Sequence, residues 1–146
     1  MASNIVNQII CSGGLFLAKD TRRFLFLLRS QGKTAGTWGL VGGKKEPKDL
    51  TAIDALKREI QEELGGEIKD AKIIPIEQFT SENGKFIYHT FLIKVEEEFV
   101  PELNNEHKGY CWVKLDDHPN PLHPGVWRTF KVKASRDKIT ALEQQN

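Results

Sequence analysis

Runs of apolar residues separated by short polar or glycine-containing segments predict strands in the first third of the chain. The run Ile5–Leu17 predicts one strand, either continuous or kinked at Gly13-Gly14. The run Phe24–Arg29 predicts a second strand, which pairs with the first as a hairpin around the turn KDTRR. After a polar loop, the segment TWGLVGG becomes apolar again and ends on two glycines.

The clearest helical pattern covers Thr51–Leu64. Apolar residues recur there at spacings of three and four, which predicts one buried stripe. These residues are Ile53, Leu56, Ile60 and Leu64. We expect Asp49 or Thr51 to cap the start of this helix and Gly65-Gly66 to end it.

The second half of the chain predicts further strands and a helical tail. The segments AKIIPIEQFT and KFIYHTFLIKVEEE predict two strands joined by the turn SENG, and YCWVKL predicts one more. A proline-rich turn region follows, and the tail from Trp127 has helical spacing at Ile139 and Leu142. We therefore expect an α+β or α/β/α fold with a mixed sheet, formed by one domain over residues 1–146.

Composition limits the classes of partner. The chain has 21 basic and 20 acidic residues, a net charge of +1 that disfavours a general nucleic-acid surface but allows a local phosphate site. Its two cysteines, Cys11 and Cys111, are expected to be reduced core residues. The sequence shows no targeting peptide and no membrane span, so we expect a cytoplasmic protein without a membrane partner. A homodimer is compatible with the sequence, and the oligomeric state is left open.

Three carboxylates crowd the end of the predicted helix. Glu59, Glu62 and Glu63 fall on one arc, because positions i, i+3 and i+4 share a face, and Arg58 flanks that arc. Like charges at this spacing repel each other, and the negative end of the helix dipole adds to the penalty. A hard divalent cation bound between these carboxylates would remove this electrostatic penalty. The alternative is a solvated acidic face balanced by Lys57 and Arg58.

Together with the glycine loop before it, this helix resembles the signature of the Nudix hydrolases, G-x5-E-x7-R-E-U-x-E-E-x-G-U, where U is a bulky apolar residue. Gly43 takes the first position, and the run REIQEELG (58–65) matches the second half. Eight residues separate Asp49 from Arg58, where the signature has seven. Either Asp49 replaces the first glutamate beside a one-residue insertion, or that role is vacant. The last apolar position is occupied by Gly66.

The resemblance implies an α/β/α sandwich with a mixed sheet and a loop–helix–loop metal site. It implies Mg²⁺, or Mn²⁺ in its place, as the cofactor. Carried over to this chain, Glu59, Glu62 and Glu63 become metal ligands and catalytic residues, the Gly43 carbonyl joins the ligands, and Arg58 orients a helix carboxylate.

Family members also take an acid from a later loop as a metal ligand or general base. Glu106, six residues before Trp112, is the leading candidate, and Glu102 and Glu98 compete with it. For substrate binding, the candidates are Arg29 and Lys44 toward phosphate and Trp38 toward a base. Each has a plainer interpretation: a surface salt bridge for Arg29, a solvated side chain for Lys44 and a core position for Trp38.

The leading functional hypothesis is an Mg²⁺-dependent pyrophosphohydrolase of a nucleoside diphosphate linked to another group, with ADP-ribose or a dinucleoside polyphosphate as the first choice of small-molecule substrate. The alternatives are a (deoxy)nucleoside triphosphate pyrophosphatase, an RNA 5′-end pyrophosphohydrolase and a non-catalytic nucleotide-binding regulator. The intact acidic helix favours an enzyme over a binder.

Overall fold

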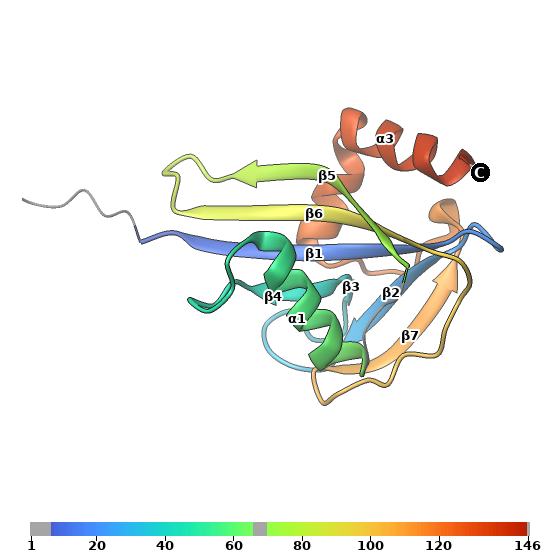
Figure 1. Ribbon diagram of the computed structural model, residues 1–146, viewed down its shortest axis with the longest axis horizontal. Helices are drawn as coiled ribbons and strands as arrows, with labels where there is room; N and C mark the ends of the chain where they lie inside the picture. The colour runs from blue at the N-terminus through green and yellow to red at the C-terminus, as the bar shows by residue number, and fades with distance from the viewer. Residues whose placement is uncertain (1–6, 66–69, 146) are drawn as a thin grey trace, which may run out of the picture.

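The computed structural model describes residues 7–65 and 70–145 and shows a mixed sheet with helices on both faces (Figure 1). The strands are β1 (Ile9–Ala18), β2 (Phe24–Arg29), β3 (Trp38–Gly39), β4 (Val41–Lys44), β5 (Lys72–Thr80), β6 (Phe86–Val95) and β7 (His107–Val113). The helices are α1 (Ala52–Leu64), the short 3₁₀ turn η1 (Leu115–Asp117), α2 (Pro124–Lys131) and α3 (Lys133–Gln144). The fold class predicted from the sequence is confirmed.

Strand β1 lies at the centre of the sheet. The hydrogen-bonded order is β3-β2-β1-β6-β5, with β4 also paired to β1 and β7 also paired to β2. β1 and β6 run parallel in unbroken register from Ile9–Phe86 to Ala18–Val95, whereas the other pairs are antiparallel. The alternative of a kink at Gly13-Gly14 is therefore wrong. The predicted start at Ile5 lies outside the described residues.

Two apolar clusters fill the space on the two faces of the sheet. Alternate residues of β1 enter different clusters, because successive side chains of a strand point to opposite faces. Phe16 joins Leu56 of α1 in one cluster, and Leu15 joins Phe130 and Ile139 of α2 and α3 in the other. Helix α1 accordingly covers one face, while α2 and α3 cover the opposite face (Figure 1).

Helix α1 begins and ends almost where the sequence predicts. The Thr51 side chain caps it by accepting a hydrogen bond from the backbone N–H of Asp54. Gly65 ends it in the left-handed conformation, with φ of 81°. The apolar stripe is buried except for Ile53, which is half-buried. Gly66 lies outside the described residues.

The second half differs from the prediction in its details. β5 and β6 form the expected hairpin, but β7 begins at His107 rather than Tyr110, and the helical tail is divided at Val132. Cys11 and Cys111 are free, as expected, but half-buried rather than fully buried. None of the helices in the described part of the chain has the length and apolarity needed to cross a membrane.

Candidate active site

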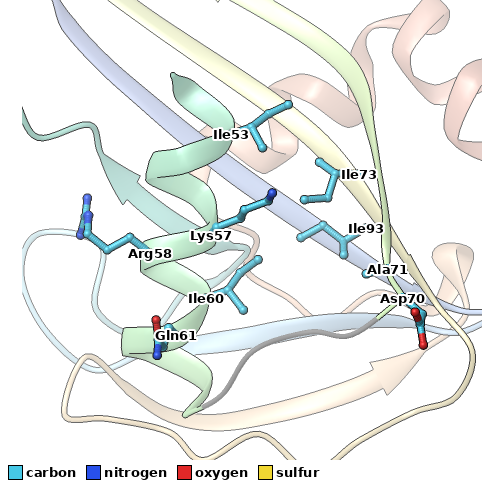
Figure 2. A pocket seen from close by; sticks show the side chains of 9 residues that line it. All are labelled: Ile53, Lys57, Arg58, Ile60, Gln61, Asp70, Ala71, Ile73 and Ile93. Atoms are coloured by element: carbon cyan, nitrogen blue, oxygen red, sulfur yellow. The ribbon is translucent and has the colours of Figure 1, made fainter. Parts of the chain in front are cut away.

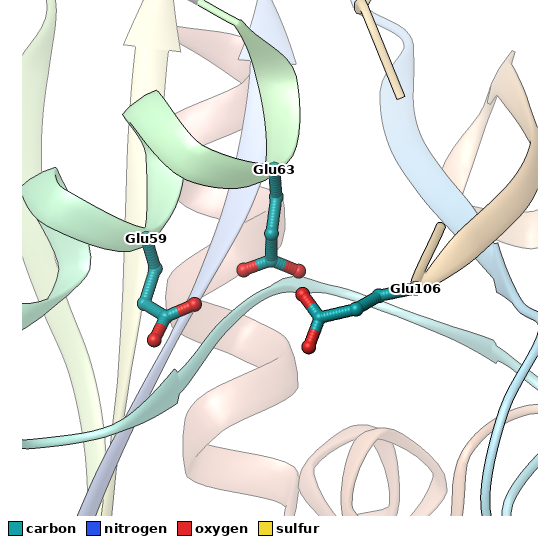
Figure 3. Close-up of side chains that lie close together, drawn as sticks. All are labelled: Glu59, Glu63 and Glu106. Atoms are coloured by element: carbon teal, nitrogen blue, oxygen red, sulfur yellow. The ribbon is translucent and has the colours of Figure 1, made fainter. Parts of the chain in front are cut away.

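Three glutamates from two distant segments meet beside α1. Glu59 and Glu63 project from the helix, and Glu106 points at them from the segment before β7 (Figure 3). One carboxylate oxygen from each lies within 4.8 Å of the others. We call these residues the acidic trio. The structure thus brings together three of the residues that the sequence singled out.

The glycine loop is built around two of these carboxylates. The backbone N–H of Gly42 donates to Glu63 Oε2 at 3.0 Å. A Cβ atom at Gly43 would lie only 2.8 Å from Glu59 Oε1, so the carboxylate occupies space that a side chain would fill. Glu59 and Glu63 therefore pack directly against the backbone of the glycine loop.

The electrostatics of the trio are dominated by Glu63, which is only 2% exposed. Burial, followed by the hydrogen bond and charge of Glu59, raises the pKa of Glu63 to about 9. Without a cation, this carboxyl group therefore keeps its proton at neutral pH. Oxygen-only donors and a surplus of negative charge suit a hard divalent cation, which would take the place of that proton. The acidic trio is compatible with divalent-metal binding.

His107 borders the trio and was missed by the sequence reasoning. Its Nδ1 lies 3.4 Å from Glu63 Oε1, yet the geometry makes no hydrogen bond, and both ring nitrogens are buried without partners. Burial and the positive charge of Arg29 lower the pKa of His107. The imidazole is therefore neutral beside a protonated Glu63. Its only sequence signal was its position next to Glu106.

Arg58 ties the glycine loop to α1. Its Nε and Nη2 donate to the Asp49 carboxylate, its Nη2 also donates to the Lys44 carbonyl, and its Nη1 donates to Glu59 Oε1 at 3.0 Å. The Asp49 side chain is 5% exposed, and hydrogen bonds from Arg58 hold its pKa below the usual range. Asp49 thus contacts the arginine of the signature despite the extra residue in the loop. Arg58 thus contacts Glu59, and its role in orienting that carboxylate stays a prediction.

Glu62 lies apart from the acidic trio. Its side chain is half exposed at 52%, and its Oε2 accepts from Arg58 Nη1 at 3.1 Å. In this arrangement the third glutamate of the motif faces the arginine rather than Glu59 and Glu63. Its role as a metal ligand stays a prediction.

Asn104, a second residue that the sequence reasoning missed, holds the loop that carries Glu106. Its Oδ1 accepts from the Glu106 backbone N–H at 2.9 Å, and its Nδ2 donates to the Glu62 carbonyl of α1 at 3.1 Å. Asparagine commonly accepts such a bond from two residues onward, and this spacing was visible in NNEHKG.

The competing acids lie elsewhere: Glu98 pairs with Arg23, and Glu102 packs against Gly65.

Arg29 lies close to the trio and has no carboxylate partner among residues 7–65 and 70–145. Its Nε donates to Thr34 Oγ1 at 2.7 Å, and no other hydrogen bond of its side chain occurs in those ranges. The strand pairing places Arg29 opposite His107, one residue from Glu106. Among those residues Arg29 therefore does not form the surface salt bridge of the alternative, and phosphate binding by this half-buried cation stays a prediction.

The other two substrate candidates differ in their exposure to solvent. The Lys44 side chain is exposed at the end of β4, near the glycine pair. Trp38 is half-buried and packs against the core cluster beneath α2 and α3, which agrees with the core alternative. Substrate contact by either residue stays a prediction.

A hollow of about 630 Å³ lies on another side of α1, between that helix and strands β5 and β6 (Figure 2). Ile53, Ile60, Ile73 and Ile93 form much of its wall, and Lys57 extends across it. It contains none of the acidic trio. The trio offers three carboxylates to one cation, whereas Asp70 is the single carboxylate among the described residues that lines the hollow, so the trio is the better candidate for a metal-dependent active site.

Comparison with known proteins identifies the family and the relatives of this chain. The family model described as NUDIX domain matches residues 12–134. The chain is 35% identical over 114 residues to the nucleoside triphosphatase NudI of Escherichia coli O1:K1 / APEC, a match that covers 70% of this chain and 80% of that relative.

Solved structures show the same fold. A MutT NUDIX hydrolase from Burkholderia pseudomallei superposes with a TM-score of 0.67 at 26% identity, covering 88% of this chain and 96% of the other. An Ap4A hydrolase from C. elegans, seen as a binary complex, gives a TM-score of 0.70 at 20% identity, covering 90% and 97%. At the latter identity, the likeness concerns the fold alone.

Proposed function

The chain belongs to the Nudix family of hydrolases, and on this premise we propose that it is a divalent-metal-dependent pyrophosphohydrolase of (deoxy)nucleoside triphosphates. The observation that carries the reaction class is the acidic trio of Glu59, Glu63 and Glu106. The 35% identity to a nucleoside triphosphatase supports the triphosphate alternative over ADP-ribose or a dinucleoside polyphosphate, which the sequence alone had favoured.

In this proposal, Mg²⁺ is held by the trio together with the Gly43 carbonyl. The residues fit such an ion, because they offer only oxygen donors and because Glu63 is buried against two other carboxylates. When bound, the ion neutralises phosphate charge and lowers the pKa of a coordinated water.

The protein groups have separate tasks. Arg58 fixes the Glu59 carboxylate through a charge-assisted hydrogen bond, and Asn104 holds the Glu106 loop against α1. Arg29 binds a phosphate with its free guanidinium edge, and Lys44 adds positive charge at the other side of the glycine loop. In this proposal, one carboxylate of the trio acts as the general base.

The first test is turnover of a nucleotide panel with Mg²⁺ or Mn²⁺, with products identified by mass spectrometry. The panel contains every (d)NTP, ADP-ribose, NADH, FAD, dinucleoside polyphosphates and a 5′-triphosphate RNA. We expect the triphosphates to give nucleoside monophosphate and pyrophosphate. Selective turnover of ADP-ribose or a dinucleoside polyphosphate would instead restore the first substrate hypothesis.

Two variants connect the activity to the site. Glu63→Gln should reduce kcat by at least roughly a hundredfold, because it removes a buried carboxylate from the trio. Glu62→Gln, a matched change on the same helix outside the trio, should cost less. Equal losses in both variants, or none in Glu63→Gln, would contradict the assignment of the trio as the catalytic metal site.

A further inference from the structure

His123 lies at the start of α2, and its ring has a single N–H donor whose position on the ring is fixed. Its Nδ1 accepts the backbone N–H of Gly125 at 3.0 Å and thereby caps the helix. Because Nδ1 is the acceptor, the proton of the neutral ring is on Nε2. Burial and the positive charge of Arg29 lower the pKa of His123, so the ring is neutral near pH 7.

The backbone places this imidazole beside Arg29. The segment that leads into α2 pairs with β3: the Trp38 N–H donates to the Pro121 carbonyl at 2.9 Å, and the His123 N–H donates to the Trp38 carbonyl at 2.8 Å. A Cβ at Gly39 would lie 3.5 Å from His123 Cβ and 3.8 Å from Arg29 Cδ. The two side chains therefore share the space above Gly39.

The donor edge of His123 is unused and accessible. Among the described residues, Nε2 has no hydrogen-bond partner. Because it is also not among the fully buried side-chain atoms that lack a partner, it is accessible to solvent. The same holds for the terminal nitrogens of Arg29. A cation and a neutral donor are thus both open to one ligand.

His123 lies on the far side of Arg29 from the trio. β7, which follows Glu106, pairs with β2, β2 pairs with β3, and β3 pairs with the segment that contains His123. Three strand spacings separate the two ends, which is about 14 Å. A substrate with its phosphates at the trio and Arg29 would therefore extend its nucleoside end toward His123.

We propose that His123 reads the nucleobase of the substrate, with its Nε2–H donating to a keto oxygen on the base. This inference rests on the proposed function. It predicts a preference for bases with a keto group at purine C6 or pyrimidine C4, such as hypoxanthine and uracil, over matched bases with an amino group at that position, adenine and cytosine. An amino group at this position would place its N–H donors opposite the Nε2–H donor of His123 and leave both groups without an acceptor. Phosphate is the less suitable ligand, because the neutral ring adds no charge and Arg29 already supplies it.

The test uses two pairs of nucleotides that differ chiefly at this group, dITP with dATP and dUTP with dCTP. Dissociation constants are measured by calorimetry with Ca²⁺ in place of Mg²⁺ to slow hydrolysis, and turnover is measured with Mg²⁺. We expect the wild type to prefer the keto member of each pair by about tenfold, as one hydrogen bond allows. In His123→Ala this ratio should fall to within about twofold.

Further variants separate reading from capping. Ser and Asn both cap helices well, but only Asn carries an N–H donor. His123→Asn should therefore recover part of the preference, whereas His123→Ser should not, although both keep the thermal midpoint of the wild type. His118→Ala changes another half-buried histidine of the same loop and should leave the ratio unchanged.

The outcomes are distinguishable. Turnover of triphosphates without a keto preference, or an equal loss for all four nucleotides in His123→Ala, overturns the base-reading role and leaves the proposed function intact. If the wild type neither binds nor hydrolyses any of the four, the proposed function fails, and this inference fails with it.

Discussion

Gly42 and Gly43 are neighbours in the sequence, but different atoms crowd them. A Cβ at Gly42 would lie 2.0 Å from the Ser12 carbonyl oxygen, a backbone atom of β1, and Gly42 has φ of 150°. A Cβ at Gly43 would instead meet the Glu59 carboxylate, the end of a side chain that can turn aside. A side chain at Gly42 would therefore collide with the sheet, whereas one at Gly43 would collide with a carboxylate of the trio.

We therefore predict that alanine substitutions at these two glycines affect different properties, stability for Gly42 and metal binding for Gly43. Gly42→Ala should lower the free energy of unfolding by about 3 kcal/mol, because backbone atoms must separate. Gly43→Ala should leave stability nearly unchanged but weaken divalent-metal binding by roughly tenfold, since Glu59 must move. Denaturant unfolding and metal titration by calorimetry measure the two effects. A loss of stability in Gly43→Ala as large as that in Gly42→Ala would contradict this division of roles.

At the level of residues, sequence spacing could predict what one helix does by itself. The separation of four residues put Glu59 and Glu63 together. The same separation places Glu62 beside Arg58, but spacing could not decide whether Glu62 turns to the arginine or to the other carboxylates, because that choice depends on the partners a side chain finds. The contacts of Asn104 with the Glu62 carbonyl and the proximity of His123 to Arg29 could not be predicted for a similar reason, because the partners are distant in sequence.

The conformation of the loop before α1 depends on one arginine, Arg58. Arg58 reaches back to Asp49, to the exposed Glu46 and to the Lys44 carbonyl, so three points of the loop converge on a single guanidinium. Of the two acids, Asp49 is the buried one. The hydrogen bonds of Asp49 therefore matter more to the position of the glycine loop than those of Glu46.

We predict that Asp49→Asn reduces metal affinity and kcat/KM by roughly tenfold, because the second partner of a ligand-orienting residue is weakened. Glu46→Gln removes a half-exposed ion pair to the same arginine and should change both quantities by less than about twofold. Steady-state kinetics and metal titration measure both variants. If Glu46→Gln is as harmful as Asp49→Asn, the loop is held by charge alone.

Prediction of elements succeeded where one periodicity continued without interruption. Apolar spacing identified α1, β5 and β6, and the glycine at 65 identified the end of α1. The start of β7 at His107 was missed because its first residues, HKG, carry no apolar alternation, while their backbone still pairs with Leu28 and Arg29 of β2. That pairing depends on another strand and left no local pattern.

At the scale of the whole molecule, one carboxylate joins the sheet to the helices on the face opposite α1. Glu77 of β5 accepts hydrogen bonds from Arg128 and Thr129 of α2 and from Ser135 of α3, the last at 2.6 Å. Burial would raise its pKa, but the bonds from Ser135 and Arg128 outweigh it, and the pKa is lowered. The charged form of Glu77 therefore stabilises the fold.

We predict that Glu77→Gln lowers the free energy of unfolding by about 1 kcal/mol at pH 7. A lowered folded-state pKa contributes stability above the unfolded pKa and loses it as pH falls through the folded pKa. The difference from the wild type should thus shrink toward zero below about pH 4. Denaturant unfolding at several pH values measures it, with the exposed Glu97→Gln as control. A difference independent of pH would show that charge is not involved.

Because β1 pairs in parallel with β6, this central strand pair cannot form until late in the synthesis of the chain. Residues of β1 leave the ribosome first, yet Ile9 pairs with Phe86, so this apolar strand waits roughly 4 to 15 s of elongation for its partner. The whole acidic helix is synthesised within that interval. A nascent chain therefore contains Glu59 and Glu63 before it has β6 to complete the sheet beneath them or Glu106 to complete the trio.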